Sequence, residues 1–261
     1  MRQPNPRLPQ PLTAMRIFVA AHRSAWVPPG SLYSVSAVGG AAVPGAAFRD
    51  DAGDSISSRN RHYCELTATY WIWKNATDDA VGLCHYRRYF NLLPTNLYAH
   101  PLVTLPAPDA TTAALLGDPR QATVIRRLLD QYDLIVPRAL YQQASIGDDY
   151  VRAHGHREWD EFVRQLDALY GADRHSARVE TRFRGNNMLI CRREVFDLYA
   201  AQLFTVIDNV FSAIGVLADV PGARYQPGRY PGYLAERFMS AFLNANRLKY
   251  FEAQVVHFDN L

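Results

Sequence analysis

The chain has few cysteines, no long apolar run and little net charge, and each shortage excludes a class of protein. Its three cysteines, Cys64, Cys84 and Cys191, lie far apart without a Cys-x-x-Cys spacing, so we expect neither a zinc site nor a disulfide framework. No apolar run approaches the roughly 18 residues of a membrane span. A net charge of +3 is too small for general nucleic-acid binding, which needs a basic stripe. Because the cysteine spacing indicates neither a zinc site nor a disulfide framework, the three cysteines are expected to be buried free thiols in a reducing cytoplasm.

The N-terminal 14 residues, MRQPNPRLPQPLTA, differ in composition from the rest of the chain. They are rich in proline and lack the apolar stretch of a signal peptide, so we expect a disordered tail over residues 1–14. The remaining residues, 15–261, contain no internal repeat and no clear boundary, which predicts one domain. Hydrophobic residues make up 48% of the chain, enough for a substantial core.

Short apolar runs of strand length alternate with segments of helical periodicity. We predict strands at residues 15–21, 80–84, 132–137, 187–191 and 248–257, and helices at residues 58–75, 122–131, 193–210 and 233–244, with a further helical stretch from about residue 154 to 170. Two regions rich in proline, 27–53 and 91–118, are expected to be mainly loops. The alternation predicts a three-layer α/β domain.

The stretch AVGLCHYRRYF, residues 80–90, ends an apolar strand with His85, Arg87 and Arg88 among aromatic rings. Ligands bind at the carboxyl ends of strands in open α/β sheets, so this cluster lies where a site is expected. Two guanidinium groups and an imidazole suit a diphosphate, whose charge they would neutralise. The alternative is a pair of surface arginines on a loop.

Two other segments supply polar groups near the same place. His22 follows the strand 15–21, where it either contacts a ligand or caps the strand. Asn60 belongs to the start of the helix 58–75, whose free N–H groups can receive phosphate. Glu65, inside that helix, is expected to be a polar partner for the backbone or for an arginine.

Five segments resemble a known family. They are GDSISSRNRHYCELTATYWIWKN, VGLCHYRRYF, YDLIVP, NNMLICRREVFDLYAAQLF and GYLAERF, in order from about Met15 to the C-terminus. They resemble the bacterial capsular and exopolysaccharide proteins grouped as domain of unknown function 4422, which is similar to the galactofuranosyltransferase module of O-antigen polymerases. The resemblance implies a GT-A-like glycosyltransferase fold with a Rossmann-like, mainly parallel sheet flanked by helices.

The resemblance also implies an activity. The enzyme would be an inverting hexosyltransferase that moves galactofuranose from UDP-galactofuranose to a glycan or lipid-linked acceptor during capsule or O-antigen synthesis. It would be cytoplasmic, with peripheral contact to the inner membrane or to other polysaccharide-assembly enzymes.

In typical GT-A enzymes an Asp-x-Asp motif binds a divalent metal on the donor diphosphate, and here His85-Tyr86-Arg87 occupies the corresponding place. Arginine cannot ligate a metal, so we expect a metal-independent enzyme in which guanidinium groups replace the cation. The expected donor-binding residues are His22, Asn60, His85, Arg87 and Arg88. The alternative is a Mg²⁺ or Mn²⁺ site assembled from Asp and His elsewhere, for example with His257.

The resemblance places the catalytic base near the start of a late helix, where a carboxylate removes the acceptor hydroxyl proton. Glu236 in GYLAERF matches this position, and Asp148 and Asp149 in SIGDDY are the alternative carboxylates. The expected acceptor or sugar contacts are Asn186, Asn187 and Arg237. Their structural alternatives are a Glu236–Arg237 ion pair, a solvated acidic loop and a turn before a strand.

Two other functions stay open on the sequence. One is a metal-dependent pyranosyltransferase that uses UDP-galactose or UDP-glucose, which EDTA would inhibit. The other is a non-catalytic carbohydrate-binding or scaffold protein of a capsule complex, which would bind no nucleotide. A phosphate hydrolase is disfavoured because no nucleophile or metal cluster is visible.

Overall fold

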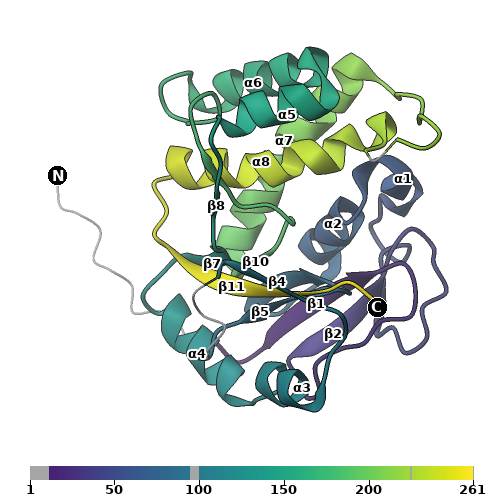
Figure 1. Ribbon diagram of the computed structural model, residues 1–261, viewed down its shortest axis with the longest axis vertical. Coiled ribbons are helices and arrows are strands. Elements are labelled where there is room, and N and C mark those ends of the chain that lie inside the picture. Colours follow the sequence, from purple (N-terminus) through teal and green to yellow (C-terminus); the bar gives the residue numbers. More distant parts are fainter. Residues whose placement is uncertain (1–11, 95–99, 224, 261) are drawn as a thin grey trace.

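Helices flank one large mixed sheet in the computed structural model, which describes residues 12–94, 100–223 and 225–260 (Figure 1). The strands of this sheet are β1 (Met15–Ala21), β2 (Tyr33–Ala37), β3 (Phe48–Arg49), β4 (Ala80–His85), β5 (Arg88–Asn91), β6 (Leu102–Leu105), β7 (Leu134–Pro137), β10 (Leu189–Arg192) and β11 (Tyr250–Phe258). Two short strands, β8 (Leu140–Tyr141) and β9 (Arg182–Phe183), pair with each other outside it.

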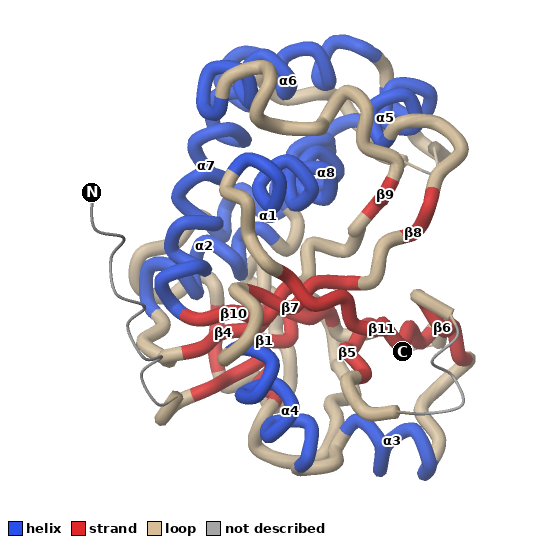
Figure 2. Tube along the Cα trace, turned by 90° about the vertical axis from the view of Figure 1, so that its left-hand side faces the viewer, coloured by secondary structure: helices blue, strands red, loops and turns tan. Residues whose placement is uncertain are grey.

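The helices cover the two faces of the sheet unequally, which gives the three layers that the sequence predicts (Figure 2). The larger layer contains α1 (Asn60–Tyr63), α2 (Leu66–Asn75), α5 (Ile146–His154), α6 (His156–Tyr170), α7 (Arg193–Ile214) and α8 (Tyr230–Ala245), with 3-10 turns at Ser57–Arg59 and Pro227–Arg229. The other layer contains α3 (Ala110–Leu116) and α4 (Arg120–Leu129). A buried apolar cluster lies on each side of the sheet, and the one under the larger layer is the more extensive.

Four strands form a parallel block in the order β3-β2-β1-β4. The almost continuous apolar sequence of β1, MRIFVAA, is typical of a parallel strand that is covered on both faces. In the pairing of β1 with β4, Ala20 lies opposite His85. The carboxyl ends of β1 and β4 are therefore neighbours, and the residues that follow them are brought to one edge of the sheet.

The rest of the sheet corrects the prediction of a mainly parallel arrangement. β4 is antiparallel to β5 and β10, and β10 is antiparallel to β7. β11 pairs in parallel with β7 and antiparallel with β5, so β4, β10, β7, β11 and β5 close into a small barrel-like ring. Sequence periodicity misses this because strands buried on both faces carry the same apolar runs in either direction.

The ring closes because β4 changes its neighbour along one edge. Ala80–Leu83 pair with β10, whereas His85 pairs with Arg88 of β5. Gly82 lies where three strands meet, and a Cβ atom there would be 3.0 Å from side-chain carbons of both Ile17 and Ile190. The pairing of β4 with β10 ends at Leu83, and the segment that precedes β10 leaves the sheet there. A fork between the two strands therefore opens next to His85.

Several predicted boundaries also need correction. The predicted helix 58–75 is interrupted at Cys64, whose φ of 53° lies in the left-handed region. The helical stretch that ends at Tyr170 is divided by Gly155, where φ is 109°. The segments expected to be mainly loops contain β2 and β3 in one case and β6 and α3 in the other. These elements are too short or too irregular in sequence for periodicity to detect.

Three smaller predictions concern the thiols, the N-terminal tail and membrane-spanning segments. Cys64, Cys84 and Cys191 are buried and free, as expected. Most of the predicted tail lies outside the described residues, but Thr13 and Ala14 donate hydrogen bonds to the carboxylate of Asp79 and are held against the fold. In the described parts of the chain, no helix is both long and apolar enough to cross a membrane.

Candidate functional site

A cavity of about 610 Å³ opens at the carboxyl ends of β1 and β4. The five residues predicted to bind a donor all line it: His22, Asn60, His85, Arg87 and Arg88. They converge because β1 and β4 are parallel neighbours, while the Asn60 side chain comes from α1 on the opposite wall. The remaining lining residues are Ala20, Val38, Arg61, Cys64, Glu65, Tyr86, Asp219 and Arg229.

The cavity carries excess positive charge, with four arginines and two carboxylates in its wall. Arg61 forms an ion pair with Asp219 at 2.9 Å, and the Nε of Arg229 donates to the Sγ of Cys64 at 3.0 Å. Arg87 donates to the carbonyl of Asp259 at 3.3 Å. Within the described residues the guanidinium group of Arg88 has no hydrogen-bond or ion-pair partner. An anion in the cavity would supply the missing countercharge.

The two histidines add little to this charge. Burial lowers the pKa of His85, and Arg88 and Arg87 lower it further, although Glu65 acts in the opposite direction. The Nε2 of His85 is hydrogen-bonded to the carbonyl of Asn186, which identifies it as the protonated nitrogen of a neutral ring. Partial burial and nearby arginines also lower the pKa of the exposed His22. Both rings are thus neutral near pH 7, and the positive charge belongs to the arginines.

A two-residue turn, Asn186-Asn187, fills the fork next to His85. Its φ angles of 76° and 48° lie in the left-handed region, which asparagine tolerates better than other non-glycine residues. The N–H of Asn186 donates to Oε1 of Glu236 at 3.0 Å, while its carbonyl accepts from His85. The Nδ2 of Asn187 donates to Oε1 of Glu65 at 2.6 Å and to the carbonyl of Gly232 at 3.2 Å. The turn therefore connects the strand-end cavity to two carboxylates.

Glu236 lies in the first turns of α8 with its side chain about one quarter exposed. Besides the Asn186 N–H, its carboxylate accepts a hydrogen bond from Nη1 of Arg237 at 3.1 Å. Burial raises the pKa of Glu236, and Glu65 adds to this effect against the opposing influence of Arg237. A partly exposed carboxylate of raised pKa has the properties of a general base.

Arg237, one of the predicted sugar contacts, is almost fully buried. Its side chain is only 7% exposed, pairs with both Glu236 and Asp149, and packs over the ring of Phe183 at 4.7 Å. Arg237 therefore holds the two carboxylates, and like Glu236, Asn186 and Asn187 it is not among the residues that line the strand-end cavity. The alternative base, Asp149, is held by this arginine at 3.4 Å, whereas Asp148 is bonded to Ser145 on another side of α5.

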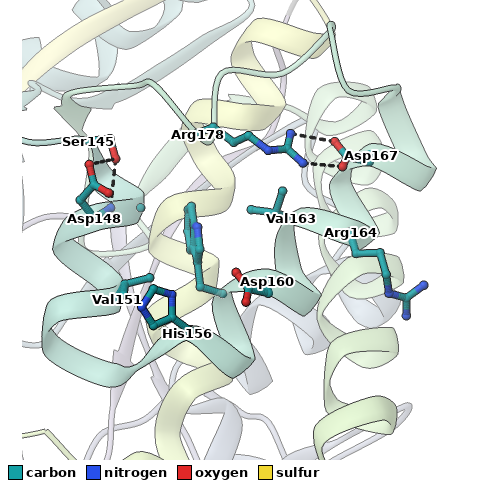
Figure 3. A pocket seen from close by; sticks show the side chains of 11 residues that line it. Ser145, Asp148, Val151, His156, Asp160, Val163, Arg164, Asp167 and Arg178 are labelled. Carbon is teal, nitrogen blue, oxygen red and sulfur yellow. Dashed lines mark hydrogen bonds and ion pairs between the residues drawn. The ribbon is translucent and has the colours of Figure 1, made fainter.

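A second cavity of about 500 Å³ lies between α5, α6 and the segment before β9 (Figure 3). Its charged groups are mostly paired with protein partners. Arg178 binds Asp167 through two hydrogen bonds of 2.6 and 3.0 Å, and Arg164 pairs with Glu161. The Arg178 guanidinium is the main cause that lowers the pKa of Asp167 to about 2. None of the residues predicted to be functional lines this cavity, apart from the alternative carboxylate Asp148.

The described residues contain no cluster of side chains that could hold a divalent metal through three protein ligands. In these parts of the chain no three His, Cys, Asp or Glu side chains gather where they could hold one ion. His257, the predicted alternative ligand, lies opposite Arg88 in the β11–β5 pairing. Its pKa is lowered by burial and then by Arg88 and Arg87. This arginine-rich surrounding disfavours a cation.

Sequence reasoning missed several residues of the cavity wall, above all Glu65 and Arg229. Glu65 was expected to be an ordinary polar residue of a continuous helix, and only the break at Cys64 turns it toward the cavity. Arg229 comes from the turn before α8, where no periodicity or motif marks it. The available signal was its Pro-Gly neighbourhood, which indicates a turn but no ligand.

A solved structure of the bifunctional glycosyltransferase WbbM, in its apo state, resembles this fold with a TM-score of 0.78. The two chains are 24% identical over 95% of the present chain. At this low identity the match shows a likeness of fold alone. The match covers 46% of the WbbM chain, so the present chain spans about half the length of that protein. No curated protein matches the chain.

A family model described as a domain of unknown function, DUF4422, matches residues 16–247. This range contains the strand-end cavity, the Asn186-Asn187 turn and Glu236, and it confirms the resemblance found in the sequence. The chain belongs to the DUF4422 family.

Proposed function

We propose that the chain is a glycosyltransferase of bacterial surface-polysaccharide synthesis that uses a UDP-sugar donor. The observation that carries the proposal is the strand-end cavity, in which four arginines meet two carboxylates and Arg88 has no partner among the described residues. A nucleoside diphosphate supplies the anionic charge that such a cavity lacks. The fold likeness to a bifunctional glycosyltransferase supports the same reading.

The proposed donor lies across the ends of β1 and β4. Arg87 and Arg88 hold the diphosphate, and His85 closes the floor beneath it. His22 and Tyr86, whose rings meet edge-to-face at 5.1 Å, form the side of the cavity that receives the nucleoside. Asn60 and Arg229 complete the opposite wall.

The proposed reaction is a single displacement with inversion. Glu236 takes the proton of an acceptor hydroxyl while that oxygen forms a bond to the anomeric carbon. The bond between the anomeric carbon and the diphosphate breaks, and its electron pair leaves with UDP. The arginines stabilise the charge that develops on the leaving diphosphate, the part that a divalent cation plays in other transferases.

The donor sugar is the finer part of the proposal. Following the family resemblance, we propose galactofuranose as the transferred sugar, and UDP-galactose and UDP-glucose are the competing donors. A glycan or lipid-linked oligosaccharide serves as the acceptor.

The test is a thermal-shift and calorimetric screen of UDP, UDP-galactofuranose, UDP-galactose and UDP-glucose in EDTA. We expect UDP and UDP-galactofuranose to raise the melting temperature of the wild-type chain. Arg88→Ala removes a charge-assisted contact and should weaken binding by about 10- to 100-fold. Arg164→Ala, an arginine of the second cavity, is the matched control and should bind as the wild type does.

Each competing function gives a different result. Binding and donor hydrolysis that appear only when Mn²⁺ or Mg²⁺ is added would identify a metal-dependent pyranosyltransferase. Absence of binding to every nucleotide, with and without metal, would favour a non-catalytic carbohydrate-binding or scaffold protein.

A further inference from the structure

Glu65 is placed in the cavity by a set of unusual local features. The preceding residue, Cys64, has φ 53° and ψ −132°, which ends α1 and lets α2 start in a new direction. The side chain of Asn60 stabilises the break by donating to the carbonyl of Cys64 at 2.7 Å and to Oγ1 of Thr67 at 2.9 Å. Gly39 leaves room for this amide, because a Cβ there would lie 2.5 Å from its oxygen. Only with the break does Glu65 reach the cavity.

The partners of Glu65 keep its carboxylate available. Its Oε1 accepts from Asn187, and no arginine forms an ion pair with it within the described residues, although four arginines line the same cavity. The second carboxylate of the cavity, Asp219, is by contrast neutralised by Arg61. The other amide hydrogen of Asn187 goes to Gly232, which fixes the direction of the amide. Glu65 is therefore a fixed hydrogen-bond acceptor with one oxygen uncommitted.

The position of Glu65 lies between the two parts of the proposed site. Its carboxylate is bonded to Asn187, and the adjacent Asn186 is bonded through its backbone to His85 at the strand ends and to Glu236 on α8. In a displacement reaction the sugar ring lies between the leaving diphosphate and the base, because its anomeric carbon is attacked from one side and released on the other. A carboxylate at this point repels phosphate and attracts hydroxyl groups.

We propose that Glu65 binds hydroxyl groups of the donor sugar and restricts the donor to neutral sugars, an inference that rests on the proposed function. A carboxylate that accepts hydroxyl hydrogens selects hydroxyl-rich sugars, and it rejects a uronic acid through charge repulsion. Glu65 is thus a determinant of donor specificity, distinct from the arginines that hold the diphosphate and from Glu236.

The experiment compares Glu65→Gln with the wild type by calorimetry, with UDP, UDP-galactofuranose, UDP-galactose and UDP-glucuronic acid as probes. Glutamine retains a carbonyl for Asn187, so the turn is kept. The variant should bind UDP at least as tightly as the wild type, since a negative charge near the phosphates is lost. Its preference for the neutral UDP-sugar over UDP should fall by about tenfold, and UDP-glucuronic acid should bind more tightly than it does to the wild type.

The control is Asp219→Asn, which removes the other carboxylate of the cavity and should leave the ratio of UDP-sugar to UDP affinity unchanged. A ratio for Glu65→Gln within twofold of the wild-type value overturns the assignment, and so does an equal change in both variants. Should Glu65→Gln fail to fold, Glu65→Asp, which withdraws the carboxylate by one methylene, replaces it. The same ratio of UDP-sugar to UDP affinity is then measured, and a value within twofold of the wild type again overturns the assignment. A wild-type chain that binds no UDP-sugar at all defeats the proposed function, a result separate from either outcome.

Discussion

Two cavities formed by the described residues both contain arginines and carboxylates, but these charged groups are in different electrostatic states. In the cavity between α5 and α6, called the helical cavity below, Arg178 and Asp167 form an ion pair (Figure 3). The pKa of Asp167 is lowered to about 2. At the strand ends Arg88 has no partner among the described residues, and burial raises the pKa of nearby Glu236. Both cavities are lined by charged side chains and are of comparable volume, so size does not distinguish them.

The two cavities differ in whether their charged side chains have partners within the protein. Paired charges contribute modestly to stability and have little capacity left for a ligand. An arginine without a partner among the described residues, Arg88, and a carboxylate of raised pKa, Glu236, are unfavourable for the folded chain alone, and such groups concentrate at functional sites. The contrast supports the proposal that the strand-end cavity binds the ligand, and we expect a structural role for the helical cavity.

The largest expected effect tests the base. Glu236→Gln should lower kcat by about 10²- to 10⁴-fold, with little change in UDP affinity, because it removes the proton acceptor and leaves the arginines intact. In the wild type the rate should fall as the pH drops through the raised pKa of Glu236, so the acid limb lies above pH 4.5. Single-turnover rates and a pH profile provide the measurement. A variant as active as the wild type would remove Glu236 from the chemistry.

The same raised pKa has a consequence for stability. The folded chain binds this proton more tightly than the unfolded chain, so the contribution of Glu236 is most favourable at low pH and declines as the pH rises through the folded-state pKa. Activity and stability thus depend on pH in opposite directions at this residue.

An intermediate effect separates the two residues of the Asn186-Asn187 turn, which contacts His85 and Glu65 of the strand-end cavity. Asn187→Ala should reduce the free energy of unfolding by about 1–3 kcal/mol, because it leaves the carbonyl of Gly232 and the carboxylate of Glu65 without their donor. Asn186→Gly should be nearly neutral, since its contacts to His85 and Glu236 use backbone groups and glycine favours its positive φ. Urea unfolding distinguishes them, and equal losses would contradict this division.

The smallest effect is expected in the helical cavity. Arg178→Ala removes a partly exposed ion pair and should lower stability by about 0.5–1 kcal/mol with no loss of turnover. Because the folded-state pKa of Asp167 is lowered, the pair stabilises the fold above pH 3.8, and the benefit disappears as the pH falls toward about 2. Thermal melts of both proteins should converge over that interval. A loss of activity at neutral pH would instead make the helical cavity functional.

The sequence predicts the elements that local chemistry determines. The strand Met15–Ala21 is found with the predicted bounds, and the strand from Ala80 is one residue longer than predicted. The gathering of His22, His85 and Arg87 is also predictable, because parallel neighbouring strands end at one edge of a sheet.

The features that sequence reasoning misses depend on contacts between distant segments. The turn at Cys64 exists because Asn60, Thr67 and Gly39 accommodate it, and cysteine itself signals no helix break. The ring of strands depends on pairings such as Leu83 with Leu189, which periodicity does not contain. The proposed role of Glu65 depends on the turn at Cys64, so the sequence alone does not predict it.

Gly82 sets the spacing at the junction of the parallel block and the ring. A Cβ atom at this position would lie 3.0 Å from side-chain carbons of both Ile17 and Ile190, so these side chains would have to move by a few tenths of an ångström to admit even alanine. His85, which lines the strand-end cavity, is three residues farther along the same strand. The absence of a side chain at Gly82 thus allows the isoleucines of β1 and β10 to pack closely on either side of β4, the strand that ends at the cavity.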